Sequence, residues 1–148
     1  MKNILLKFFT RTTDDVEPVD LEHKLRVATA VLLVEAMRAD FLVEESERLR
    51  LRALLESQFQ LPASELDALL EQAETDADQL VSLQHVTRLL NENYDQAMKL
   101  RVIEMMWQVI FADGEKDHYE EHMIRQIADL LYVSHGDFIQ ARHKAEAN

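Results

Sequence analysis

Residues 105–131 read MMWQVIFADGEKDHYEEHMIRQIADLL, and residues 32–55 read LLVEAMRADFLVEESERLRLRALL. In each stretch an apolar run leads into an Ala-Asp pair, a Glu follows seven residues after the Asp, and a second amphipathic run follows the Glu. The four acids of this pattern are Asp40, Glu47, Asp113 and Glu120. The second pair follows the first by 73 residues at both positions, which predicts two related halves, each made of a helix, an acidic turn and a second helix.

The composition favours helices throughout the chain. Its 148 residues include only two Gly and two Pro, so the loops must be short and a turn-rich β fold is disfavoured. A chain of this length normally forms one domain with one substantial core. We therefore predict an all-α bundle of about seven helices, built from two pseudo-repeated halves. The predicted helices are residues 21–39, 44–58, 62–73, 78–93, 98–112, 117–131 and 134–145.

Two of these helices are expected to form the centre of the bundle. Residues 21–39 and 98–112 are apolar on nearly all sides over much of their length, which is typical of helices that neighbours bury. The bulky cluster on the second helix, formed by Met105, Met106 and Trp107, is expected to lie in the core.

Three local features complete the expected architecture. Glu35, inside the first apolar run, is expected to pair with a nearby Arg or to face the acidic turns. The acidic stretch 71–78 is expected to be an exposed junction between the halves. Residues 134–137 read SHGD, a capping-box pattern that predicts a helix start.

Residues 1–17 are predicted to form an amphipathic arm and linker before a helical domain at residues 18–148. Within residues 1–11, four apolar side chains share one face of a helix: Ile4, Leu5, Phe8 and Phe9. The basic residues beside this face are Lys2, Lys7 and Arg11. The segment is expected to dock on its own domain or on a second subunit. Membrane contact is the least favoured interpretation, because one short helix has little membrane affinity.

The charge and the residue types exclude several classes of function. A formal net charge of −12 disfavours contact with phosphate backbones, so nucleic acid is not an expected partner, whereas a basic protein or a divalent cation is. The absence of Cys excludes disulfides, thiolate metal sites and Cys nucleophiles. No membrane-spanning run and no adequate signal peptide is recognisable, so a cytoplasmic location is expected.

The acidic turns are the best functional lead. Asp40 and Asp113 stand where their helices are predicted to end, next to the negative end of the helix dipole. Three partners would compensate for this placement. The carboxylates would accept hydrogen bonds from backbone N–H groups, with Glu47 and Glu120 acting as capping acids. Alternatively, all four acids would converge on one divalent cation such as calcium, magnesium or zinc, or a basic partner protein would dock there.

Two other functions remain open. His118 and His122 match the H-x-x-E-H pattern of inverted zinc peptidases and would share a helix face, which raises the alternative of a small metal-dependent hydrolase. Such enzymes need a third ligand and a larger scaffold. A pure dimerisation module is the second alternative. Because no catalytic constellation is present, we expect a non-enzymatic domain that acts through protein contacts, as a homo-oligomer or with a protein partner.

These residues resemble the tellurite-resistance TerB-like family of bacterial helical domains. The resemblance rests on the two quoted stretches, spans about residues 28–145, and is most specific at Ala112-Asp113-Gly114 with Glu120. It implies an all-α fold related to the helical domain at the start of some membrane-anchored DnaJ-type co-chaperones, and no known enzyme activity. It also implies a role in stress or tellurite resistance through assemblies, with acidic residues as metal ligands. The first half departs from the pattern, because Phe41 stands where Gly is usual.

Overall fold

The computed structural model describes residues 18–39, 45–80, 82–113 and 118–147. For Pro18, Val19, Asp113 and residues 118–120 it describes the backbone alone. The arm and linker predicted at residues 1–17 therefore lie outside the described residues.

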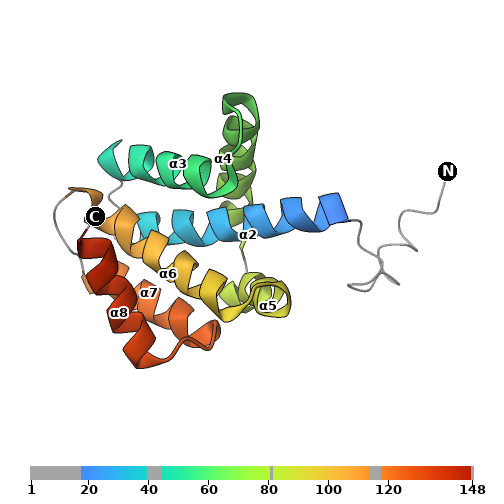
Figure 1. Cartoon of the computed structure of the whole chain (residues 1–148). Coiled ribbons are helices and arrows are strands. Elements are labelled where there is room, and N and C mark those ends of the chain that lie inside the picture. The colour runs from blue at the N-terminus through green and yellow to red at the C-terminus, as the bar shows by residue number, and fades with distance from the viewer. Residues whose placement is uncertain (1–17, 40–44, 81, 114–117, 148) are drawn as a thin grey trace.

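Helices make up the described part of the chain, which contains no strand (Figure 1). In chain order the elements are α2 (Pro18–Arg38), α3 (Glu45–Phe59), α4 (Ala63–Asp78), α5 (Leu83–Asn93), α6 (Gln96–Ile110), the 3-10 turn η2 (Phe111–Asp113), α7 (His118–Leu130) and α8 (His135–Glu146). These seven α-helices of the described residues confirm the predicted all-α fold. None of them combines the length and the apolar character that a membrane crossing requires.

The helices α2 and α6 form the centre, as predicted. The run from Val27 to Val34 on α2 and the run from Val102 to Ile110 on α6 are buried. Helix α2 packs against α3, α4, α5, α6 and α7, and α6 also packs against α3, α7 and α8. Figure 1 shows α2 crossing the molecule between α3 with α4 on one side and α6 with α7 on the other. Met105, Met106 and Trp107 lie in the core, which confirms that prediction.

Short polar side chains begin three of the helices. The Asp95 carboxylate accepts a hydrogen bond from the Met98 amide at 2.9 Å, and the Ser82 hydroxyl accepts one from the Gln84 amide at 3.1 Å. The Ser134 hydroxyl accepts one from the Asp137 amide at 3.2 Å, which confirms the predicted cap at the start of α8. Each cap satisfies an amide that has no partner inside the helix.

The acidic stretch 71–78 is not a junction, and that prediction was wrong. Helix α4 continues to Asp78, five residues past the expected end at Ala73. Ala73 and Ala77, one turn apart, are buried, and α4 packs extensively against α2. Two acids of the stretch also form ion pairs with neighbouring helices. They are Glu74 with Arg48 at 3.2 Å and Asp78 with Arg38 at 2.7 Å.

The connection between the halves therefore comes later than expected. Helix α5 begins at Leu83 and not at Asp78, because the Ser82 cap fixes its first turn. The segment from Gln79 to Ser82 joins the two helices.

The packing has the pairing that a duplicated helical hairpin predicts. The contact of α2 with α4 corresponds to that of α6 with α8, and these are the two most extensive contacts between helices of the described chain. The contact of α3 with α6 likewise corresponds to that of α7 with α2. Helices α3 and α7 begin at Glu45 and His118, which are also 73 residues apart. The internal repeat stays a prediction, because residues 40–44 and 114–117 at the two corners lie outside the described residues.

Candidate functional site

The four predicted site acids are described to different extents. Asp40 lies outside the described residues. Asp113 is the last residue of η2 and Glu120 lies in the first turn of α7, but only their backbones are described. Glu47 alone has a described side chain. Whether the four carboxylates share one site therefore stays a prediction.

Glu47 is a buried carboxylate. It lies in the first turn of α3 and has 0% of its surface exposed, whereas its neighbours Glu45, Ser46 and Arg48 are exposed. Helical spacing places Glu47 on the same face as the buried Leu51, one turn later. A buried charge requires compensation from its surroundings, and Glu47 does interact with other groups in this structure. The positive end of the α3 dipole adds to that compensation.

The helix that carries Glu47 meets the turn that ends in Asp113. Helix α3 belongs to the first half, η2 belongs to the second, and the two pack against each other. Figure 1 shows the start of α3 and the end of α6 at the same end of the molecule. The fold thus brings together the segments that hold one acid of each predicted pair. Carboxylate oxygens are ligands that hard cations such as calcium and magnesium prefer.

Aromatic stacking holds η2 in place. The Phe111 ring stacks on the Trp107 ring with centroids 5.5 Å apart and planes 18° apart. The Arg142 guanidinium, from α8, lies 5.3 Å from the centroid of the Trp107 ring. The same guanidinium donates a hydrogen bond to the Glu121 carboxylate of α7 at 3.3 Å. This chain of contacts ties α6, α8 and α7 together beside the second acidic turn.

A further acid lies close to the end of α2. Glu35 is half-buried, and burial raises the pKa of its carboxyl above the ordinary value of 4.5. The positive charge of Arg38 opposes this rise in the pKa, and the negative charge of Asp78 adds to it. Arg38 donates a hydrogen bond to Asp78 at 2.7 Å, which ties the end of α2 to the end of α4. The ion pairs of the described residues include none between Glu35 and an Arg, so the predicted pairing is not confirmed.

The sequence reasoning missed a second buried acid. Glu104 lies in the buried run of α6, where Arg101 approaches its carboxylate to 3.1 Å and Lys144 of α8 to 4.0 Å. The spacing of Arg101 and Glu104, three residues apart on one helix, was the available signal. The contribution of Lys144 depends on how α8 crosses α6, which the sequence does not reveal. The contact with Lys144 joins α8 to α6.

The histidine pair proposed for the hydrolase alternative is only half described. His122 is exposed on α7, and the side chain of His118 lies outside the description. Among the described residues, no three His, Asp or Glu side chains gather in a way that would hold a metal ion. Since three of the four predicted acids are outside that search, the metal prediction itself stays untested.

The comparison with known proteins gives a family. Residues 26–143 match the family described as "Tellurite resistance protein TerB". No curated protein and no solved structure matches the chain significantly. The match covers most of the chain and includes both acidic turns and the helices that flank them. The chain therefore belongs to the TerB family.

Proposed function

We propose that this TerB domain is a non-enzymatic, cytoplasmic protein that acts through protein contacts in the response to stress and tellurite. In this proposal a divalent cation binds at the two acidic turns through Asp40, Glu47, Asp113 and Glu120. The family description supports the link to tellurite resistance. The observation that carries the cation site is the buried Glu47 carboxylate on α3, the helix that packs against η2.

Electrostatics favours a bound cation over compensation of the carboxylates by backbone N–H groups alone. Carboxylates that approach one another repel, and either protonation or a positive ion must relieve that repulsion. Helix dipoles stabilise Glu47 and Glu120, which lie in first turns, but oppose an acid placed just after a helix. Asp113 is the last residue of η2, the 3-10 turn that directly follows α6. A bound cation would stabilise both kinds of acid at once.

The rest of the surface supports a basic protein partner. The chain carries a formal net charge of −12. The outer face of α4 exposes several acids, namely Glu65, Asp67, Glu71 and Asp78. Complementary charge on a partner would speed encounter and fix orientation. A cation at the nearby turns would then link ion binding to the position of α3, which packs against both α4 and η2.

Calorimetric titration with calcium, magnesium, manganese and zinc tests the cation site. The wild-type chain is compared with a variant carrying Asp40→Asn and Asp113→Asn, and with Asp67→Asn, which removes a carboxylate on α4. We expect binding heat for at least one ion in the wild type and in Asp67→Asn, and at least about a tenfold weaker affinity in the double variant. If no ion gives heat or changes the melting temperature of the wild type, the acids act only as helix caps.

Light scattering on the same samples addresses the mode of action. A chain that binds an ion and stays monomeric requires a different protein as its partner. A dimer whose formation does not depend on any ion, combined with no binding heat, would support a pure dimerisation module.

A further inference from the structure

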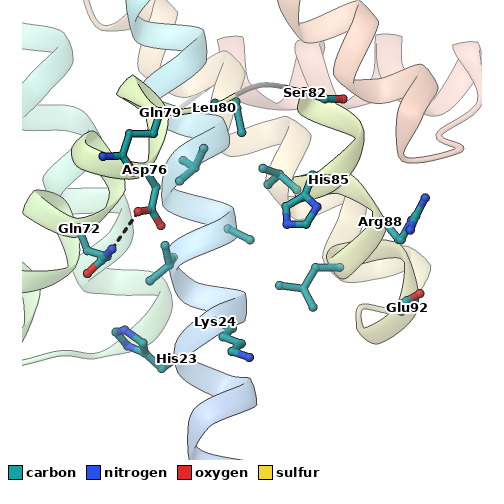
Figure 2. Close-up of a pocket in the computed structure, with 15 residues that line it drawn as sticks. His23, Lys24, Gln72, Asp76, Gln79, Leu80, Ser82, His85, Arg88 and Glu92 are labelled. Carbon is teal, nitrogen blue, oxygen red and sulfur yellow. Dashed lines mark hydrogen bonds between the residues drawn. The ribbon is translucent and has the colours of Figure 1, made fainter. Parts of the chain in front are cut away.

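A groove runs along the first half of α2, between α4 and α5. Its volume is about 1060 Å³. Figure 2 shows α2 at its floor, with Asp76 of α4 on one side and His85 of α5 on the other. The α2 residues that line the groove lie between His23 and Val31, whereas the first acidic turn follows Arg38 at the end of this helix.

The groove has an apolar floor and a polar rim. Val27 and Val31 of α2 contribute to the floor, and Val86 and Leu89 of α5 form part of one wall. Lys24 and Arg88 also line the groove, and the Arg88 side chain extends outward from α5 in Figure 2. An elongated depression of this kind, bounded by helices, suits one face of an amphipathic helix.

We propose that residues 1–11 of the same chain dock in this groove as an amphipathic helix. These residues lie outside the described part, and their helical character is a prediction from the sequence. Their apolar face carries Ile4, Leu5, Phe8 and Phe9. Leaving two Phe side chains in water would be unfavourable, and the groove supplies apolar surface that covers them.

The dimensions of the chain permit this contact. Residues 12–17 connect the segment to Pro18 at the start of α2, and six extended residues span at most about 20 Å. The groove begins near His23, about 8 Å along the axis of α2 from Pro18. A helix of eleven residues is about 16 Å long, and the floor from His23 to Val31 is about 12 Å long. The short connection also gives the segment a high effective concentration at the groove.

The rim of the groove carries charges of both signs. Asp76 and Glu92 line the groove, and neither forms an ion pair with another described residue. Asp76 accepts a hydrogen bond from the Gln72 amide group at 2.9 Å. The charged residues of the segment are all basic, namely Lys2, Lys7 and Arg11. Lys24 and Arg88 of the same lining repel these basic residues, so the net attraction comes from the formal net charge of −12 on the chain as a whole.

Disulfide trapping in the full-length chain tests the docking, because the protein has no Cys of its own. The test chain carries Phe8→Cys and His85→Cys, and the control chain carries Phe8→Cys and Gln140→Cys, at an exposed position of α8. At micromolar protein under mild oxidation, we expect the groove pair to form an intramolecular disulfide at least about tenfold faster than the control pair. Equal rates for the two pairs would overturn the proposal.

Two additions to the same assay identify which face of the segment docks and whether the same chain or a second copy supplies it. Phe9→Glu, on the apolar face, is expected to reduce the rate of the groove pair to that of the control, whereas Thr10→Glu, on the opposite face, is expected to leave it unchanged. Disulfide-linked dimers as the main product would show that a second copy supplies the segment, and would overturn docking within one chain. Cation binding is not required for either result, so this proposal and the proposed function can fail separately.

Discussion

The Arg142 guanidinium lies 5.3 Å from the centroid of the Trp107 ring, across the contact between α8 and α6. Both side chains also contact a third helix or turn. Arg142 donates to Glu121 of α7 at 3.3 Å, and Trp107 stacks on Phe111 of η2. The cation–π contact and the ring stacking together connect the last helix, through Trp107, to the turn that ends in Asp113.

Replacing Arg142 with Ala is expected to lower the free energy of unfolding by about 1–2 kcal/mol. The change removes both the cation–π contact and a partly buried ion pair, whose side chains are 22% and 23% exposed. His143→Ala, at the exposed neighbouring position on α8, is the matched control and is expected to change stability by less than about 0.5 kcal/mol. Urea denaturation followed by circular dichroism measures both. Equal stabilities of the two variants would show that the contact with Trp107 contributes nothing.

The packing of α4 on α2 gives a second prediction. Ala73 is fully buried, so Ala73→Leu inserts a larger side chain where little space exists and is expected to cost about 1–3 kcal/mol. Ala68→Leu, at an exposed position of the same helix, has the same change in volume and is expected to be nearly neutral. Thermal denaturation of both variants is the measurement. A neutral Ala73→Leu would contradict a helix that continues, packed on α2, through the acidic stretch.

Helices α2, α6 and α4 show which parts of the fold could be predicted from the sequence and which could not. The buried runs of α2 and α6 followed from their apolar periodicity, because burial on all sides leaves a direct compositional signal. The end of α4 did not follow, because residues 71–78 are rich in acids, whereas in the structure Ala73 and Ala77 pack in the core and Glu74 and Asp78 pair with Arg48 and Arg38. Local composition carries no record of ion pairs made with other helices.

The candidate site was predictable to a similar degree. The burial of Glu47 follows from its place one turn before Leu51 on the apolar face of α3, so helical periodicity contains that signal. The packing of α3 against η2 is a contact between the two halves, and only the three-dimensional arrangement reveals it. The role of Arg142 depends in the same way on the crossing of α8 over α6.

Glu35 makes stability depend on pH in a defined direction. Because burial raises the pKa of its carboxyl above 4.5, the folded state holds this proton more tightly than the unfolded state does. The resulting stabilisation is fully present below about pH 4.5 and is lost as the pH rises through the folded-state pKa. Glu35→Gln, which cannot ionise, is therefore expected to be more stable than the wild type at pH 7. The difference should shrink below pH 4.5.

Urea titrations at steps of about one pH unit between pH 3.5 and pH 8 measure the free energy of unfolding of both proteins. Glu56→Gln, at an exposed position of α3, is the control for the loss of one negative charge. If the stability gained by Glu35→Gln were the same at every pH, ionisation of Glu35 would not be its cause.

The cation proposal predicts different effects for two acids in the first turn of α3. Glu47 is buried beside the core, whereas Glu45 is exposed two residues earlier. A bound ion that is present at 100 times its dissociation constant stabilises the folded wild type by about 2.7 kcal/mol. Glu47→Gln removes one anionic ligand from the proposed site and is expected to abolish most of that increase. Glu45→Gln removes the same charge from the same turn and is expected to retain it.

Thermal unfolding with and without the ion identified by calorimetry measures this difference directly. Each variant is compared with itself, so any change that a substitution makes to the stability of the ion-free protein cancels. A helix-capping role for Glu47 predicts instead a lower melting temperature without ions and no increase when an ion is added, in either variant. An equal ion-dependent increase in Glu47→Gln and in the wild type would exclude Glu47 as a ligand, even if the cation binds elsewhere on the acidic surface.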